Sequence, residues 1–345
     1  MGRPDLFFVM STQLGAQRIA QRGKLRRIER LAAHTRIEAA GGRARDGRRV
    51  RRHRSSRGYS RVRRHPRRGR RRRAMTYAAL RAALAAAGVE NSAGEARILL
   101  TSLCGINAAD LPFCDFTDAG GRLADAVARR TRHEPLQYIL GKWPFYKEEY
   151  FVSPDCLIPR ADTELLVETL VADLPRGARL LDLCTGSGCI AISTAKNRPD
   201  IAALAADLSD GALRLATRNA AANGVTTVDF AKLDVTAPSP LDERFDCIVA
   251  NPPYIRADVV PTLAPELSYE PKMALDGGAD GLDFYRAILT NFAENLKRGG
   301  TFLFEFGYDQ AADAEALAAA HGLDCTPLSD LGGRFRAARM MQRKV

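Results

Sequence analysis

The sequence lacks the features of several common protein classes. None of its apolar runs approaches the roughly 18 residues that a membrane-spanning helix needs, and residues 6–10 (LFFVM) are too few for a secretory signal. Its seven cysteines form no Cys-x-x-Cys pair and lie near no histidine cluster, which indicates neither a disulfide framework nor a zinc site. We therefore expect a soluble, metal-free protein of a reducing cytosol, with no membrane contact.

Acidic residues are scarce in residues 1–74. This segment has 24 Arg and one Lys but only four Asp and Glu, a balance of +21, whereas residues 75–345 have a balance of −9. Its end, RVRRHPRRGRRRRA (61–74), has too few large apolar side chains to form a core, and its like charges repel each other. We expect this extension to be disordered. Four explanations stay open: a nucleic-acid-binding arm, an organellar transit peptide, a solvated tail, or a stretch that is not translated because Met75 is the true start.

Residues 75–140 have a helical pattern. The stretch 77–88 (YAALRAALAAAG) ends at Gly88, and a second helix opens with Ser92 and Glu95 at the spacing of a capping box. A third begins near Thr117 and Asp118. This pattern predicts a small helical domain over 75–140, followed by a linker over 141–164 in which prolines 144, 154 and 159 break any long helix.

Strands and helices alternate in residues 165–345. Strands are predicted at 179–184, 201–207, 227–234, 245–251 and 300–307, helices at 190–198, 211–224, 283–296 and 309–321, and a weaker pair of strands near 323–328 and 335–341. The alternation predicts an α/β fold of the Rossmann-like type, a mainly parallel sheet with helices on both faces. Such sheets bind ligands outside the carboxyl ends of their strands.

The first two of these strands end in residues that suit a nucleoside. Gly186 and Gly188 allow the backbone to turn sharply and to approach a ligand, and the next helix offers free N–H groups. Asp207 ends the second strand, 21 residues after Gly186, where a carboxylate can accept hydrogen bonds from both ribose hydroxyls. Each feature alone has a structural alternative: a strand-to-helix turn for the glycines, and a helix N-cap for Asp207. Together they predict an adenosine-containing cofactor.

Dinucleotides and S-adenosylmethionine (SAM) both contain adenosine. A pyrophosphate calls for a full G-x-G-x-x-G turn, but Ala191 takes the last position here. Asp234 ends the third strand, where it would lie at the adenine amino group of SAM. The choice between the two cofactors depends on the fourth strand.

Asn251, Pro252, Pro253 and Tyr254 follow that fourth strand. Proline has a fixed φ and no N–H, so Asn251 and the Pro252 carbonyl are predicted to face the pocket as hydrogen-bond acceptors, with Tyr254 as a flat neighbour. This arrangement suits a planar group that bears an NH₂, such as an amide. Amide nitrogen is a poor nucleophile, and two acceptors would direct its lone pair toward the methyl group of SAM, so that positioning replaces a catalytic base. A structural Asn-Pro-Pro turn is the alternative.

These motifs resemble a known family. NPPY (251–254) and LDLCTGSG (181–188) resemble the SAM-dependent amino-group methyltransferases, which include DNA adenine, RNA guanine and protein glutamine enzymes. The stretches 134–168, 270–289 and 304–310 look like those of the bacterial release factor glutamine methyltransferases, and the resemblance covers nearly all of residues 75–345. It implies a class I methyltransferase fold, SAM as cofactor, and methylation of the glutamine in the Gly-Gly-Gln motif of class I peptide chain release factors. The helical domain would dock the partner, and the family's usual start lies close to Met75.

The resemblance also implies roles for single residues. It assigns these to the cofactor: Cys184, Thr185, Gly186, Ser187, Gly188, Asp207, Asp234, Val235 and Asn251. It assigns these to the glutamine: Asn251, Pro252, Pro253, Tyr254, Phe145 and Arg160. For Phe145 and Arg160, a core aromatic and a surface ion pair are the alternatives. Cys184 stands where the family usually has glycine, and we expect a local adjustment without loss of binding.

Three other functions stay open. A related enzyme that methylates a ribosomal-protein glutamine would share the glutamine-binding residues 251–254 and the linker 141–164. A nucleic-acid methyltransferase would need a translated arginine-rich arm and a basic face, and the negative balance of residues 75–345 argues against it. If the protein were a non-enzymatic binding module, the predicted hydrogen-bond acceptors at Asn251 and Pro252 would have no explanation. We expect a monomer whose residues 75–345 contact no nucleic acid.

Overall fold

The computed structural model describes residues 75–111, 115–116 and 121–343. They belong to two compact units that divide after Thr131, residues 75–131 and residues 132–343. The predictions for residues 1–74, and for a helix start at Thr117 and Asp118, lie outside the described residues.

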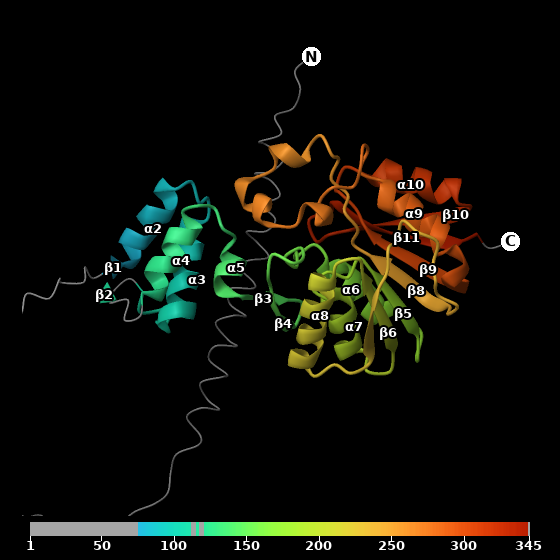
Figure 1. The fold of residues 1–345 in the computed structure, drawn as a ribbon, viewed down its shortest axis with the longest axis horizontal. Helices are drawn as coiled ribbons and strands as arrows, with labels where there is room; N and C mark the ends of the chain where they lie inside the picture. The colour runs from blue at the N-terminus through green and yellow to red at the C-terminus, as the bar shows by residue number, and fades with distance from the viewer. Residues whose placement is uncertain (1–74, 112–114, 117–120, 344–345) are drawn as a thin grey trace, which may run out of the picture. The chain divides into compact units, whose positions relative to one another are not determined.

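The first unit is helical in its described residues. It contains α2 (Tyr77–Ala86), α3 (Ser92–Cys104) and α4 (Arg122–Arg130), with a short strand pair of β1 (Met75–Thr76) and β2 (Asp115–Phe116) (Figure 1). Buried leucines of the three helices form its core: Leu80, Leu84, Leu99, Leu100 and Leu123.

The cap of α3 differs from the predicted capping box. Asn91, and not Ser92, accepts the hydrogen bond from the Gly94 N–H, at 3.3 Å. Because the helix already begins at Ser92, Glu95 lies one position too far along to reach back to the cap. Glu95 instead pairs with Arg130 of α4, with 2.6 Å between its Oε2 and the arginine Nε.

The second unit is built on a seven-stranded sheet with the order β10-β11-β9-β8-β5-β6-β7 (Figure 1). Strands β5 to β9 are parallel, and β10 and β11 are antiparallel to their neighbours. The bounds are β5 (Arg179–Leu183), β6 (Ala202–Asp207), β7 (Val228–Lys232), β8 (Phe245–Ala250), β9 (Leu296–Glu305), β10 (Leu323–Ser329) and β11 (Phe335–Gln342). The predicted Rossmann-like fold class is confirmed.

Helices cover both faces of this sheet (Figure 1). Cys247 and Val249 of β8 pack into a core with α6 (Glu164–Asp173), α7 (Cys189–Asn197) and α8 (Asp210–Asn223). Ile248 and Ala250 point the other way, into a core with α9 (Asp283–Asn291) and α10 (Ala311–Ala320). Two covered faces explain why β8 is apolar throughout instead of alternating. The sequence pattern does not predict α6, and the predicted helix over 283–296 is divided into α9 and a 3₁₀ turn, η4 (Ala293–Asn295).

Two connections position the site. Helix α5 (Leu136–Leu140) leads into a hairpin of β3 (Lys142–Phe145) and β4 (Glu148–Phe151), within the predicted linker. Between β8 and α9 the chain forms three 3₁₀ turns, η1 (Val260–Thr262), η2 (Pro265–Tyr269) and η3 (Lys272–Ala274). Strand β5 has β6 on one side and β8 on the other, which makes its carboxyl end the switch point where sheets of this type bind ligands. Within the described part of the chain, no helix combines the length and apolarity that crossing a bilayer requires.

Candidate active site

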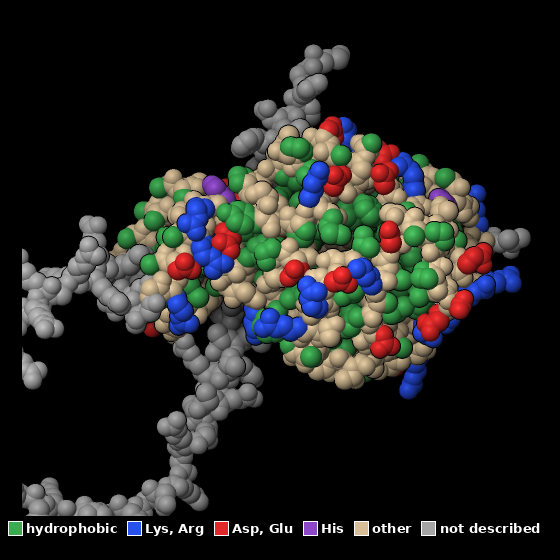
Figure 2. Space-filling view, viewed as in Figure 1, with side chains coloured by type: hydrophobic (Ala, Val, Ile, Leu, Met, Phe, Trp, Pro, Cys, Tyr) green, Lys and Arg blue, Asp and Glu red, His purple; other side chains and the backbone are tan. Residues whose placement is uncertain are grey.

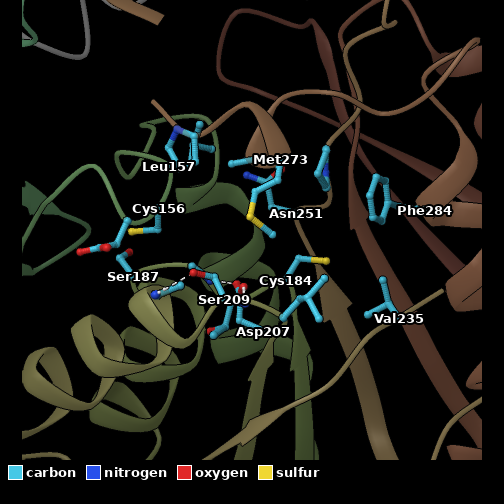
Figure 3. A pocket seen from close by; sticks show the side chains of 18 of the residues that line it. Cys156, Leu157, Cys184, Ser187, Asp207, Ser209, Val235, Asn251, Met273 and Phe284 are labelled. Carbon is cyan, nitrogen blue, oxygen red and sulfur yellow. Dashed lines mark hydrogen bonds between the residues drawn. The ribbon is translucent and has the colours of Figure 1, made fainter. Parts of the chain in front are cut away.

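A cavity of about 530 Å³ opens at the carboxyl edge of the sheet, next to β5. Its walls come from the ends of β5 to β8, from residues 155–163 before α6, from residues 271–276 and from α9. Figure 3 shows Asp207 on one side of the cavity and Asn251 on another, with Val235 and Phe284 both at the right of the view. The volume is in the range of small-molecule sites.

The loop after β5 makes a sharp turn on the cavity wall. Cys184, Gly186 and Gly188 all have left-handed backbone angles, with φ of 55°, 55° and 80°. Glycine adopts this conformation easily, but at Cys184 it costs about 1–2 kcal/mol. Cys184, which stands where the family usually has glycine, is therefore a strained residue. The loop keeps its turn despite this strain.

Asp182, which the site prediction did not include, holds this loop from behind. Its Oδ2 accepts hydrogen bonds from the Thr185 hydroxyl at 2.6 Å and from the Ala191 N–H at 3.1 Å. Its Oδ1 is buried and has no hydrogen-bond partner. Complete burial raises the pKa of Asp182 to about 7. A carboxyl in a strand that is otherwise apolar was the signal for it in the sequence.

Asp207 lies at the end of β6, on the opposite side of the loop. Its Oδ2 accepts a hydrogen bond from the Gly186 N–H at 2.8 Å, and its Oδ1 accepts one from the Ser209 N–H at 2.9 Å (Figure 3). Burial raises its pKa. The Leu208 N–H also acts on this carboxyl, which keeps acceptor capacity for a further donor. The N-cap of α8 is Ser209, whose side chain accepts from the Ala212 N–H, so Asp207 does not cap that helix.

Apolar side chains continue the wall beyond Asp207. Leu208, Val235 and Phe284 line the cavity, and Leu208 is 46% exposed. Asp234 also lines it but is itself exposed, and hydrogen bonds from the Thr236 side chain and N–H lower its pKa. The sequence identified Asp234 and Val235, but it missed Leu208 and Phe284.

Asn251 lies on the cavity wall where β8 ends. Its Nδ2 donates a hydrogen bond to the Thr163 hydroxyl, over 3.2 Å. The carbonyl oxygen is therefore the end of this amide that remains for a ligand. Pro253 also lines the cavity.

The Asn-Pro-Pro-Tyr corner is held from outside by close packing. A Cβ added at Gly277 would lie 2.7 Å from the Pro253 oxygen and 2.8 Å from the Tyr254 Cα. The Ile255 N–H donates to the Leu275 carbonyl, and the Gly277 N–H donates to the Ile255 carbonyl. This packing needs glycine, and it fixes the backbone of the corner.

Arg160 lines the cavity and forms an ion pair with Glu270, which is not the surface pair given as the alternative. The other oxygen of Glu270 accepts from the Ile158 N–H at 2.9 Å. The Glu270 side chain is 2% exposed. It thus joins the segment before α6 to the segment after β8, a role that no local sequence signal indicated.

Four predicted residues do not lie on the wall of this cavity. They are Phe145, Gly188, Pro252 and Tyr254. Phe145 is fully buried and meets Tyr150 edge-on, in the core beneath α6 and α7. Tyr254 packs against the opposite core, and burial raises its pKa. Gly188 has no space for a side chain, because an added Cβ would lie 2.7 Å from Ile192 Cδ1 and 3.1 Å from Ala216 Cβ.

Charges of both signs are interspersed on the surface in view. On the face of residues 132–343 that Figure 2 shows, Lys and Arg side chains alternate with Asp and Glu, with apolar side chains between them. This face of the described residues therefore has no continuous basic area of the kind that a nucleic-acid backbone requires.

The fold and the site define a class I, Rossmann-like methyltransferase. Residues 160–280 match the model of the Methyltransferase small domain, and residues 76–141 match that of the PrmC N-terminal domain. The release factor glutamine methyltransferase of Geobacter sulfurreducens is 40% identical over 72% of this chain and 89% of its own. That of Cereibacter sphaeroides is 41% identical over 75% of this chain and 95% of its own.

The chain belongs to the release factor glutamine methyltransferase family, which confirms the resemblance found in the sequence. Among solved structures, it is similar to a release-factor-specific protein-(glutamine-N5) methyltransferase from Alicyclobacillus acidocaldarius. The identity is 31%, the match covers 56% of this chain and all of the other, and the TM-score is 0.34.

Proposed function

We propose that this protein methylates the side-chain amide nitrogen of the glutamine in the Gly-Gly-Gln motif of class I peptide chain release factors, with SAM as methyl donor. Membership of the family supports the reaction. The observation that carries the proposal is that Asn251 and Asp207 line the same cavity from the ends of β8 and β6.

The residues of the cavity fit SAM. Asp207 has acceptor capacity left for a ribose hydroxyl, and Leu208, Val235 and Phe284 would form an apolar slot for the adenine. The turn of Thr185, Gly186 and Ser187 would hold the methionine end. When bound, SAM supplies an electrophilic methyl carbon on a sulfonium.

The residues of the corner act on the glutamine. The Asn251 Oδ1 would accept one N–H of the amide at the cavity wall. The Pro252 carbonyl would accept the other N–H, although Pro252 does not line the cavity in the free protein, and the two acceptors together would direct the nitrogen lone pair into the cavity. Neither group removes a proton: the N–C bond would form as the S–C bond of the sulfonium breaks to leave a neutral thioether, and the surplus amide proton would then leave to water. The contribution of the protein is therefore positioning, which accounts for up to about 7–11 kcal/mol in the best intramolecular cases. Arg160 and Tyr254 would support the walls of the glutamine site.

The three consecutive parts of residues 75–345 are proposed to have different roles. Residues 75–140 would dock the release factor, 141–164 would line the site, and 165–345 would bind SAM. The model match over 76–141 is the support for the first of these. The protein would act as a monomer, and a chain begun at Met75 would retain full transfer.

A competition assay tests this function. The full chain receives methyl-labelled SAM together with a release factor, a ribosomal protein and an RNA, and a chain begun at Met75 is assayed in parallel. Label should appear on the release factor and disappear when its Gly-Gly-Gln glutamine is replaced by alanine. Label on the ribosomal protein or the RNA, with none on the release factor, would refute the assignment.

A further inference from the structure

Asn251 and Glu305 lie side by side at the carboxyl edge of the sheet. Ala250 of β8 pairs with Phe304 of β9, so the next residues, Asn251 just past the end of β8 and Glu305 at the last position of β9, are neighbours at the same edge of the sheet. Thr163, just before α6, is buried between them with 2% of its surface exposed. Three elements far apart in the sequence therefore meet at this point.

Thr163 is the link between the two side chains. Its hydroxyl accepts a hydrogen bond from Asn251 Nδ2 at 3.2 Å, and it is close enough to the Glu305 carboxyl for side-chain hydrogen bonding from Thr163 to lower the pKa of that carboxyl against the effect of burial. A threonine hydroxyl has a single proton. Since that oxygen accepts from Asn251, its own proton is available to an ionised Glu305. The hydrogen bonds then run in one direction, from Asn251 to Thr163 to Glu305.

This direction decides which end of the Asn251 amide faces the cavity. The two ends are similar in size but opposite in hydrogen bonding, because the NH₂ donates and the oxygen accepts. Only the oxygen can accept an N–H of a substrate amide. We propose that Thr163 and Glu305 are positioning residues that hold Asn251 with its oxygen toward the cavity. This inference rests on the proposed function for the identity of the substrate, but the orientation is a property of the free protein.

Glu305 makes the orientation sensitive to pH. The carboxyl is 3% exposed, its Oε2 has no hydrogen-bond partner, and burial raises its pKa to about 7. When protonated, Glu305 can donate to Thr163, which frees the threonine proton for the Asn251 oxygen and favours the reversed amide. The titratable and charged side chains that act on or near this carboxyl are Asp162, Arg160, Arg336, Tyr254, Tyr285 and Cys189. Of these, Asp162 raises the pKa of Glu305, and the two arginines lower it.

The direct test observes the Asn251 amide without substrate. In the full chain with ¹⁵N-asparagine, the Asn251 NH₂ resonances are identified by their loss in Asn251→Ala and followed across pH. They should shift with a midpoint near pH 7 in the wild type and stay constant in Glu305→Gln and in Thr163→Val. Resonances that titrate equally in all three proteins, or in none, would overturn the proposal.

Kinetics supply the second test. Thr163→Val should lower kcat/KM for the release factor about tenfold, the effect of one lost hydrogen bond to a functional group, and Thr163→Ser should restore it. The dissociation constant of SAM should be unchanged. Thr194→Val is the matched control, because Thr194 is equally buried but its hydroxyl donates to the Ile190 carbonyl. Full transfer by Thr163→Val would refute the positioning role and leave the proposed function standing, whereas absence of transfer by the wild type would refute the function and leave the resonance test valid.

Discussion

The sheet of residues 132–343 has one hollow at the carboxyl ends of its strands, the carboxyl edge, and another at their amino ends, the amino edge. The one at the carboxyl edge has a volume of about 530 Å³, and the one at the amino edge, between the end of α6 and the starts of β8 and β9, about 280 Å³. Carboxyl groups lie at both edges: Asp173 and Asp246 line the hollow at the amino edge, whereas Asp182 and Glu305 lie behind the cavity wall at the carboxyl edge. The two edges differ in how completely these carboxyl groups are hydrogen-bonded or ion-paired.

At the amino edge the carboxylates are paired. Asp246 accepts from the Lys297 ammonium at 2.8 Å and from the Arg179 N–H at 2.7 Å, and Asp173 pairs with Arg339. Although burial opposes it, this hydrogen bonding lowers the pKa of Asp246. At the carboxyl edge, Asp182 and Glu305 each have a buried oxygen with no partner, and burial raises both pKa values to about 7.

The difference separates a structural hollow from a functional one. The paired carboxylates at the amino edge add to stability and have little acceptor capacity left for a ligand. The carboxyl edge contains buried groups that are not fully hydrogen-bonded, and a strained backbone at Cys184. Such features lower stability and are concentrated where proteins bind ligands and react.

The largest predicted contrast comes from glycine replacements at the two edges. Gly188→Ala should cost about 3 kcal/mol, because the left-handed backbone and the contact with Ala216 both oppose a methyl group. It should also weaken SAM binding at least about tenfold, since the loop must move. Gly299 at the amino edge also has a positive φ, but a Cβ added there would meet no atom within 4 Å. Gly299→Ala should therefore cost only about 1–2 kcal/mol and leave SAM binding unchanged. Urea unfolding and calorimetric titration measure the two effects, and equal SAM affinities would contradict the contrast.

A second contrast concerns pH. The pKa of Asp182 is raised on folding, so the native protein binds a proton that the unfolded chain has lost, and stability falls as pH rises toward the folded pKa. Between about pH 5 and about pH 7, this one group should lower the free energy of unfolding by about 2 kcal/mol. Asp182→Asn should remove that part of the slope. Asp246→Asn is the control, because a lowered pKa leaves Asp246 ionised across this range in both states. If Asp246→Asn flattened the pH dependence of the free energy of unfolding more than Asp182→Asn, the assignment of this dependence to Asp182 would be contradicted.

The smallest predicted effect is at Cys184. Cys184→Gly should stabilise the protein by about 0.5 kcal/mol, because relief of the left-handed backbone slightly exceeds the added entropy of the unfolded chain. Cys184→Ala retains the backbone strain and should not stabilise. Thermal unfolding compares the two variants. A gain in Cys184→Ala equal to that in Cys184→Gly would show that the thiol, and not the backbone, is the source of the effect.

Local patterns predicted the parts of the site that follow strand ends. Gly186 and Asp207 were identified from apolar strands and their spacing, and the structure joins them by a hydrogen bond across 21 residues. Thr163 and Glu270 could not be found this way. Their partners lie 88 and 110 residues away, and the strand order, not a local motif, brings them together. Phe145 belongs to a core that depends on α6, a helix that the pattern did not reveal.

The central claim is that the Asn251 side chain, set at the carboxyl edge, positions the amide that is methylated. Its most direct test is methyl transfer from labelled SAM to a release factor by Asn251→Ala, with Asn295→Ala, at a more deeply buried asparagine near the amino edge, as the control. Transfer should fall at least about hundredfold in Asn251→Ala, with SAM affinity within about threefold of the wild type, and should persist in Asn295→Ala. Transfer by Asn251→Ala at the wild-type rate would contradict the account.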